Sequence, residues 1–186
     1  MSRAVIQVIY SELSKTLYHG SDRFFTKIDL SYSAPKKDFG CGFYTTTDKH
    51  QAEKFAKLKA RRSKSSKGFV ALFELESFEG LVIKQFGSAD ERWFDFVLGN
   101  RGHELLAQKS ERQLYDIVIG PVANDAVGLV LNQFISGVYG DPSTSEAKAT
   151  AIRLLMAQTL HNQVFFGTEL AISCLKFLEV YDVQLD

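Results

Sequence analysis

The chain has 186 residues, of which 45% are hydrophobic, and its 22 basic and 22 acidic side chains give a formal net charge of zero. These values predict one globular domain over residues 1–186, and they give no indication of binding to nucleic acid or a membrane through overall charge. Two cysteines are too few for a disulfide framework, no metal-ligand spacing occurs and no apolar run could span a bilayer, so we expect a cytoplasmic protein without a metal.

The first part of the chain is predicted to contain short elements and a long loop. Residues 4–10 are apolar and indicate a strand or a short helix. Residues 17–21, Leu-Tyr-His-Gly-Ser, indicate a short strand that runs into a turn at Gly20. Residues 22–37 indicate a loop with at most one helical turn. His19 is a candidate ligand-binding residue, although a structural histidine would give the same pattern.

The stretch from Asp38 to Ala56 is predicted to be a glycine-broken loop, a short strand and a helix. Residues 42–46, Gly-Phe-Tyr-Thr-Thr, combine aromatic and β-branched side chains, which favour a strand. Asp48 is placed to cap the helix, with Gln51 as the reciprocal partner of a capping box. The strand therefore leads almost directly into the helix.

Two aromatic side chains of this stretch are placed to form a slot for a ligand. Tyr44 lies on the strand, and Phe55, eleven residues later, lies about two turns into the helix. Two rings on either side of a slot hold a flat aromatic ligand by stacking. Packing of both rings in an ordinary core explains the same pattern, so the residues alone leave both alternatives open.

The same helix is predicted to run through the one strongly basic segment of the chain, Lys54–Lys67. The serines in this segment and the following Gly68 are predicted to end the helix. A solvated helix face and a contact for phosphates or an acidic partner are both open for this segment. Its basic side chains beyond Lys54 are Lys57, Lys59, Arg61, Arg62, Lys64 and Lys67.

The rest of the chain combines short strands with helices that are clustered in blocks, which indicates the α+β class. Strands are predicted at residues 69–75, 81–86, 115–122, 163–166 and 176–185. Helices are predicted from a capping box at 88–91 to residue 102, over 127–138 and over 168–174. A further helix is predicted to begin at Asp141-Pro142. Its buried face is predicted to contain Ile152, Leu155, Met156, Thr159 and Leu160. Trp93 is predicted to lie in the core.

Three motifs in this order resemble the ADP-ribosyltransferase superfamily, in its diphtheria-toxin-like and PARP-like branch. They are residues 18–21 (Tyr-His-Gly-Ser), 42–46 (Gly-Phe-Tyr-Thr-Thr) and 166–169 (Phe-Gly-Thr-Glu), which are similar to the His, Tyr and Glu motifs of that branch. The resemblance is closest to a group of small bacterial proteins long catalogued as a domain of unknown function, and it implies the toxin half of a toxin–antitoxin pair. It also implies two packed, mostly antiparallel sheets with an NAD cleft and helical elaborations.

Glu169 matches the catalytic glutamate of the superfamily, which hydrogen-bonds the ribose 2′-hydroxyl of NAD. Transfer from NAD breaks the bond between nicotinamide and ribose, and a carboxylate stabilises the positive charge that grows on the ribose. A glutamate favoured by the dipole at a helix start explains the same residue without catalysis. Gly167 stands where arginine-modifying members carry Glu or Gln, so the resemblance argues against arginine as the acceptor.

The resemblance also implies a set of contacts with NAD. His19 would hydrogen-bond the ribose of the adenosine half, and the backbone of Gly20 would pair with the nicotinamide amide. Tyr44 and Phe55 would sandwich the nicotinamide ring; related proteins often have tyrosine at the second position, so stacking survives there but a hydroxyl is lost. Two hydroxyl side chains would brace the floor of the cleft: Thr45 and Thr46. The resemblance assigns no chemistry to Asn100-Arg101 or Asn124-Asp125.

These expectations describe an NAD-dependent ADP-ribosyltransferase that uses NAD as a substrate. The acceptor is a protein, a nucleic acid or a small molecule, and a cognate antitoxin protein is a further expected partner. NAD hydrolysis without an acceptor is one alternative. A binding or interaction module that keeps the cleft without turnover is another, against which the intact set of His19, Tyr44 and Glu169 argues.

Overall fold

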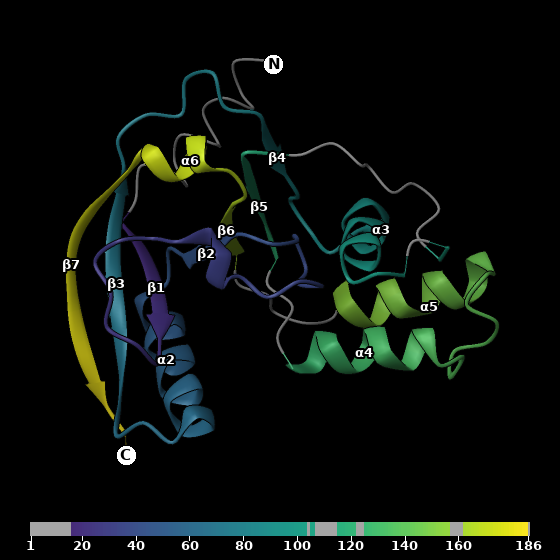
Figure 1. The fold of residues 1–186 in the computed structure, drawn as a ribbon. Coiled ribbons are helices and arrows are strands. Elements are labelled where there is room, and N and C mark those ends of the chain that lie inside the picture. The colour runs from purple at the N-terminus through teal and green to yellow at the C-terminus, as the bar shows by residue number, and fades with distance from the viewer. Residues whose placement is uncertain (1–15, 104, 107–114, 122–124, 157–161, 186) are drawn as a thin grey trace.

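The computed structural model describes residues 16–103, 105–106, 115–121, 125–156 and 162–185 (Figure 1). The expected element at residues 4–10 lies outside them, as do Thr159, Leu160 and Asn124. The described residues form an α+β structure, as the sequence predicts. Within them, no helix is both long and apolar enough to cross a membrane.

Seven strands form one mixed sheet in the order β4-β5-β6-β2-β1-β3-β7. Five of its pairings are antiparallel, and β4 with β5 is parallel. The sheet is mostly antiparallel, as expected, but it is a single sheet where two packed sheets were expected. The strands are β1 Leu17–Ser21, β2 Phe43–Thr46, β3 Lys67–Leu75, β4 Ile83–Gln85, β5 Ile117–Pro121, β6 Asn162–Phe166 and β7 Leu175–Gln184.

The helices lie in three places around this sheet (Figure 1). One long helix covers β1 and β3, three helices form a separate group, and a short helix follows β6 at one end of the sheet, while a further 3-10 helix lies in the loop between β1 and β2. In chain order they are the 3-10 helix η1 Leu30–Tyr32, α2 Lys49–Ser63, α3 Glu91–Asn100, α4 Asp125–Ile135, α5 Ser145–Met156 and α6 Glu169–Ser173.

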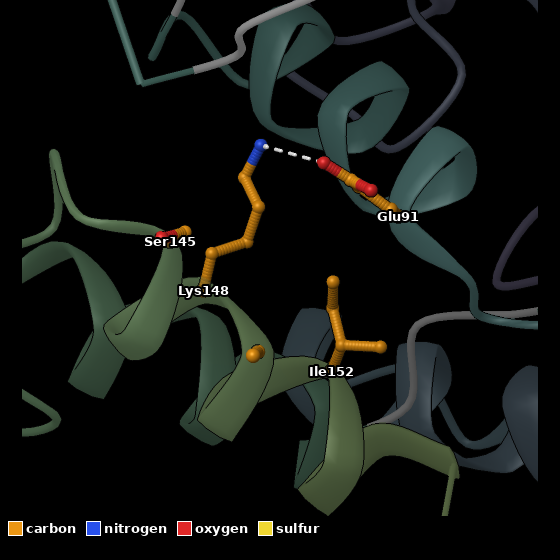
Figure 2. A pocket seen from close by; sticks show the side chains of 5 residues that line it. Glu91, Ser145, Lys148 and Ile152 are labelled. Atoms are coloured by element: carbon orange, nitrogen blue, oxygen red, sulfur yellow. Dashed lines mark ion pairs between the residues drawn. The ribbon is translucent and has the colours of Figure 1, made fainter.

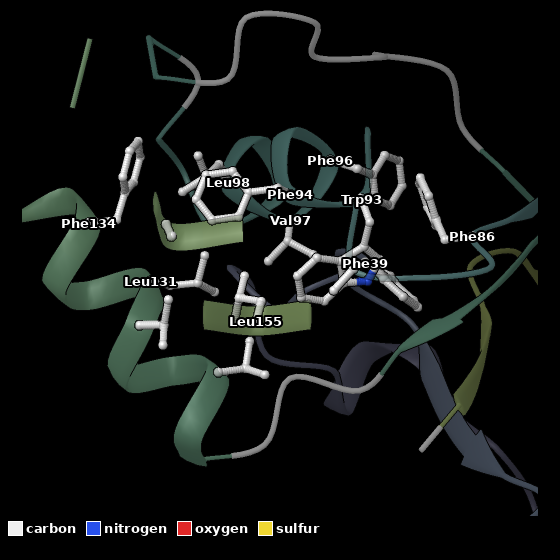
Figure 3. Packing of buried hydrophobic residues seen from close by; sticks show 14 of the residues in the cluster. Phe39, Phe86, Trp93, Phe94, Phe96, Val97, Leu98, Leu131, Phe134 and Leu155 are labelled. Atoms are coloured by element: carbon white, nitrogen blue, oxygen red, sulfur yellow. The ribbon is translucent and has the colours of Figure 1, made fainter. Parts of the chain in front are cut away.

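The largest buried cluster joins α3, α4 and α5 to one face of β5 and β6, and Figure 3 shows its packing. Trp93 is fully buried, as predicted, and its Nε1–H donates to the Pro121 carbonyl oxygen at 3.2 Å. α3 and α5 are also joined by a buried ion pair, with Lys148 Nζ 2.6 Å from Asp95 Oδ1. The cluster holds the three helices against this part of the sheet.

α2 packs closely on the sheet because small residues meet at the contact. A side chain at Gly20 would place its Cβ 2.2 Å from the Ala52 carbonyl oxygen, and one at Gly68 would place it 2.7 Å from the Ala56 carbonyl oxygen. Ala52, Ala56 and Ala60 are the buried residues of this helix. Glycine on β1 and β3 therefore allows the helix axis to approach the strands.

The capping interactions of two helices differ from those predicted. Asp48 caps α2 as expected, but Gln51 Oε1 accepts from the Thr46 hydroxyl, which itself accepts from the Asp48 N–H. The capping residue of α3 is Asp90, whose carboxylate accepts from the Trp93 N–H. The expected box beginning at Ser88 is therefore wrong, because the chain enters the helix two residues later.

The ends of three predicted helices also need correction. The basic helix ends at Ser63, with Lys64 in the left-handed region, and Lys67 begins β3. α5 begins at Ser145 because Asp141 accepts from the Ser143 N–H and forms a turn before the helix. Two side chains predicted for apolar faces are instead exposed: Val138, beyond the end of α4, and Met156.

Candidate functional site

The candidate site lies where β1 and β2 meet, near the middle of the sheet (Figure 1). β1 pairs with β3 at five positions, whereas its ladder with β2 contains the single pair Tyr18–Thr46. β2 pairs with β6 at four positions. This single pair therefore joins one half of the sheet, with β4, β5, β6 and β2, to another half, with β1, β3 and β7.

His19 joins the two halves through its side chain. Its Nδ1 lies 2.6 Å from the backbone carbonyl oxygen of Tyr44. A carbonyl oxygen only accepts, so Nδ1 carries the hydrogen and Nε2 of the neutral ring is an acceptor. The imidazole stacks on Phe43 at 4.5 Å between ring centroids, and Phe25 meets its edge. The ring is thus held in one orientation, with Nε2 left to accept from a ligand hydroxyl.

The surroundings of His19 keep it neutral at physiological pH. Burial lowers the pKa of His19 to about 4, and the positive charges of Lys59 and Lys37 act in the same direction. The hydrogen bond to the Tyr44 carbonyl opposes this shift in pKa without cancelling it. The tautomer inferred from the geometry is therefore the form present at pH 7.

The Tyr44 side chain has contacts both in the core and at the candidate site. Its hydroxyl donates to the Gly40 carbonyl oxygen at 2.7 Å and accepts from the Phe39 N–H at 3.1 Å. The ring packs against Phe165 at 5.0 Å between centroids, and Lys37 Nζ stands 5.1 Å from its centroid. Burial raises the pKa of the phenol. The hydroxyl therefore holds the loop before β2 in place, and the ring contacts the positively charged side chain of Lys37.

Phe55 lies on α2 and is 46% exposed. Lys59, one turn later, places its Nζ 5.1 Å from the Phe55 ring centroid. The ring contacts of Tyr44 are with Phe39 and Phe165, so the structure does not bring Tyr44 and Phe55 into direct contact. Each of the two rings predicted to form the slot thus carries a lysine over it. The sandwich of a ligand between them stays a prediction.

Three further predicted site residues have structural contacts. The Thr45 hydroxyl donates to the Val164 carbonyl oxygen at 3.0 Å and so ties β2 to β6. The Thr46 hydroxyl holds the start of α2 through Gln51 and the Asp48 N–H. Gly20 is where α2 rests on β1. These contacts position β2 and α2, and the roles predicted for the three residues toward NAD stay predictions.

Glu169 is the exposed first residue of α6. Thr168 caps this helix, accepting from the Ala171 N–H, and its own hydroxyl donates to Asp116 Oδ1 at 2.6 Å. Glu169 follows β6 by three residues, and Phe166 at the end of β6 pairs with Phe43, on which His19 stacks. In the described part of the chain, no contact joins the Glu169 side chain to His19 or Tyr44. The strand that leads to it, β6, pairs with β2, which carries Tyr44.

Arg101 holds the loop that precedes β2. Its guanidinium contacts Asp38 Oδ1 from Nε at 2.7 Å and from a terminal nitrogen at 2.6 Å. Asp38 immediately precedes Phe39, whose N–H binds the Tyr44 hydroxyl. Asn100 beside it donates to the Phe96 carbonyl oxygen at the end of α3. The sequence predicted that Asn100 and Arg101 close the helix, as they do, and assigned them no chemistry; the structure adds a positioning role.

The prediction from sequence missed four residues that surround His19 and the two rings. Lys59 follows Phe55 by four residues on one helix, and this spacing could have indicated their contact. Phe25, Phe43 and Lys37 lie on a loop or at a strand end, where no periodic pattern shows which way a side chain points. Among the described residues, no three His, Cys, Asp or Glu side chains are grouped as a metal site requires.

A separate cavity of about 220 Å³ lies between α3 and α5 (Figure 2). Lys148 in its wall is already neutralised, since its Nζ lies 2.6 Å from Asp95 and 3.8 Å from Glu91. This cavity contains none of the predicted site residues, and three of its five lining residues are exposed at the surface between the two helices. Its lining residues are Glu91, Ser145, Lys148, Ala149 and Ile152.

Comparisons with known proteins give one match. Neither the curated proteins nor the solved structures include a match to this chain. A family model described as a protein of unknown function, DUF3990, matches residues 15–177, which include β1 with His19, β2 with Tyr44 and the start of α6 with Glu169. Because this match spans most of the 186 residues, the chain belongs to the DUF3990 family.

Proposed function

We propose that the protein is an NAD-dependent ADP-ribosyltransferase, which transfers ADP-ribose from NAD to an acceptor and releases nicotinamide. The observation that carries this proposal is the 2.6 Å contact between His19 Nδ1 and the Tyr44 carbonyl oxygen. It joins two of the three motifs at the β1–β2 junction, and β6, which leads to Glu169, pairs with β2. Three short motifs far apart in the sequence thus lie on neighbouring strands.

The division of the sheet supports the two-sheet fold that the resemblance implies. A single residue pair holds β1 to β2, and the two halves on either side have longer ladders of their own. In the described residues β1 and β2 share no further pair, and the Tyr44 carbonyl oxygen between them is bound to His19. A nicotinamide amide could pair with the remaining backbone groups there, as expected for the backbone of Gly20.

In the proposed reaction, the Glu169 carboxylate stabilises the transition state electrostatically. The bond between the nicotinamide nitrogen and the ribose carbon breaks, nicotinamide leaves with the electron pair, and positive charge grows on the ribose. An exposed carboxylate that makes no ion pair in the described structure can approach this charge and stabilise it. A nucleophilic atom of the acceptor then bonds to the ribose carbon and releases its proton.

In the proposed reaction, His19 and the aromatic rings of Tyr44 and Phe55 bind NAD. His19 Nε2 accepts a hydrogen bond from a ribose hydroxyl, because Nδ1 is committed to the Tyr44 carbonyl. Tyr44 offers the ring face that now lies under Lys37, and Phe55 offers a half-exposed ring on α2. Stacking on such faces suits nicotinamide, which is flat and aromatic.

Gly167 limits the choice of acceptor. A Cβ at this position would lie 2.8 Å from both the Phe165 ring and the Tyr115 carbonyl oxygen, so no side chain fits there. The glutamate or glutamine that orients an arginine in related enzymes therefore has no place in this fold. We propose a different protein side chain, a nucleic acid or a small molecule as acceptor, and the resemblance favours a bacterial toxin held in check by a cognate antitoxin.

The proposal is tested with NAD labelled in its adenosine half and incubated with the protein and a bacterial lysate. Released nicotinamide and macromolecular label are measured for wild type, Glu169→Gln and the control Glu179→Gln, which removes an exposed carboxylate on β7. Glu169→Gln should lower nicotinamide release by about 100-fold or more, because only the charge is lost, while the control stays near wild type.

Label on macromolecules identifies transfer, and nicotinamide release without label identifies NAD hydrolysis with water as acceptor. Wild-type protein that binds NAD but releases no nicotinamide would show a binding module instead of an enzyme. Turnover by Glu169→Gln at the wild-type rate would remove Glu169 from the mechanism.

A further inference from the structure

Two lysines from separate elements approach the candidate site. Lys37 lies in the loop before β2, and its Nζ stands 5.1 Å from the Tyr44 ring centroid. Lys59 lies on α2, and its Nζ stands 5.1 Å from the Phe55 ring centroid. Both side chains are partly buried, and both charges act on His19. The two ammonium groups therefore belong to the surroundings of one histidine.

Neither lysine has an ion pair in the described part of the chain. Asp22 and Asp38 favour the charged forms of Lys59 and Lys37 from a distance, but Asp38 is bound to Arg101. Burial lowers the pKa of Lys59, and the charge of Lys37 lowers it further. Burial likewise lowers the pKa of Lys37. Two positively charged side chains thus lie in a partly desolvated region, and a bound anion would stabilise their charged forms.

We propose that Lys37 and Lys59 bind the diphosphate of the dinucleotide substrate, an inference that rests on the proposed function. An ammonium group offers three donors, and a diphosphate carries two negative charges and several acceptor oxygens. Because His19 Nε2 is left to accept from a ribose hydroxyl, the phosphates attached to that ribose lie near the two lysines. The aromatic faces under the lysines are then exposed to nicotinamide as the ammonium groups turn to the phosphates.

This assignment separates Lys59 from the rest of the basic segment. Arg61 and Arg62, two and three residues later, are exposed at the end of α2. Lys59 instead points along the helix to Phe55. A change at Lys59 should therefore alter NAD affinity, whereas changes at Arg61 and Arg62 should not.

The test compares Lys37→Gln/Lys59→Gln with Lys36→Gln/Lys54→Gln, which removes the same charge from exposed neighbours in the same two elements. Affinities for NAD, ADP-ribose and nicotinamide are measured by calorimetry at two salt concentrations. The first variant should bind NAD and ADP-ribose about 10- to 100-fold more weakly at low salt and bind nicotinamide as wild type does. The control should stay within about twofold, and the salt dependence should shrink only in the first variant.

Stability without ligand is measured in parallel. Removal of two unpaired cations relieves repulsion, so the midpoint of thermal unfolding of Lys37→Gln/Lys59→Gln should not fall below that of wild type. ADP-ribose affinity equal to wild type, or an equal loss in the control variant, would overturn the proposal. So would wild-type protein that binds neither NAD nor ADP-ribose.

These outcomes are distinct from failure of the proposed function. Loss of ADP-ribose binding in the variant, with no nicotinamide release by wild type, supports the diphosphate site and rejects the enzyme. Nicotinamide release that depends on Glu169 but not on the two lysines supports the enzyme and rejects the diphosphate site.

Discussion

A histidine that donates from Nδ1 to a backbone carbonyl accepts at Nε2 as long as the ring stays neutral. In this protein the carbonyl belongs to Tyr44, and stacking on Phe43 restricts rotation of the ring. Protonation of His19 would turn Nε2 into a donor and would bring a third positive charge to Lys37 and Lys59. Acidification should therefore weaken both the fold and the acceptor function of His19.

The pH dependence of stability follows from the lowered pKa of His19. The pKa is about 4 in the folded protein and about 6.5 in the unfolded chain, so between these values the unfolded chain binds a proton that the folded protein does not. The contribution of His19 is present above pH 6.5 and is lost as the pH falls toward 4. Relative to His19→Gln, wild type should lose about 1–2 kcal/mol of unfolding free energy between pH 7 and pH 5.

Urea denaturation of the two proteins at pH 7, 6 and 5 measures this difference. Carboxylates also titrate in this range, but they are common to both proteins and cancel in the comparison. Parallel curves of unfolding free energy against pH would mean that His19 titrates near its ordinary pKa in the folded protein.

At the residue scale, sequence reasoning gave the identity of the candidate side chains but not their partners. The Tyr44 ring packs on Phe165, as expected for a core residue, and it also lies under Lys37, while its part in a ligand slot stays a prediction. That Lys37 would turn toward this ring depends on the loop held by Asp38 and Arg101, two residues 63 positions apart. No local pattern contains such a contact.

At the scale of elements, the position of α2 depends on the absence of a side chain at Gly20. Gly20→Ala would place a Cβ 2.2 Å from a backbone oxygen of α2, which cannot rotate away, so the helix must shift. We expect a loss of about 2–3 kcal/mol of unfolding free energy and weaker NAD binding, because Phe55 and Lys59 move with α2.

Gly87→Ala is the matched control for this change. A Cβ at Gly87 would have no atom within 4 Å, and we expect its unfolding free energy to stay within about 0.5 kcal/mol of wild type. Chemical denaturation and calorimetry measure both quantities. If Gly20→Ala were as stable as Gly87→Ala, the tight contact between β1 and α2 would not be needed for the fold.

The positions of helices and strands were well predicted where the hydrophobic periodicity and the length of a segment indicated the same type of element. β5 is buried throughout, as its apolar sequence indicates, and β2, β6 and α6 lie close to their expected positions. Helix starts were less predictable, because several residues able to cap stand close together. Asp90 rather than Ser88 begins α3, and the choice depends on how Trp93 enters the core.

At the scale of the whole molecule, a chain without net charge carries a basic patch on α2, formed by the exposed side chains of Lys54, Arg61 and Arg62. Such a patch attracts anionic macromolecules over a distance set by salt. Reversal of three exposed charges, Lys54→Glu/Arg61→Glu/Arg62→Glu, should leave nicotinamide release without acceptor within about twofold of wild type. Macromolecular labelling in lysate should fall by about tenfold at low salt, and the deficit should shrink as salt rises.

A triple variant elsewhere on the surface controls for the change of net charge: Arg92→Glu/Arg153→Glu/Lys176→Glu reverses exposed charges on α3, α5 and β7. An equal loss of labelling in this protein would assign the effect to overall charge. Unchanged labelling in the α2 variant at low salt would make the basic patch a solvated face only.

The sheet order was the part of the fold that sequence reasoning could not supply. Local patterns predict where strands lie, but the partners of a strand are set by contacts between distant segments. β4 follows β3 in the chain yet pairs with β5, and β7 returns to pair with β3. The expected pair of sheets came from the resemblance, and the described strands form one sheet instead.

The place of β6 in the sheet has a consequence for protein synthesis. β6 is next to last along the chain but lies between β5 and β2, so β4 and β5 have no link to the first three strands before residues 162–166 leave the ribosome. The strand that closes this gap leads within three residues to Glu169. A nascent chain therefore joins the two parts of its sheet at nearly the same moment as it acquires the proposed catalytic carboxylate, and it lacks that carboxylate while the two parts are still separate.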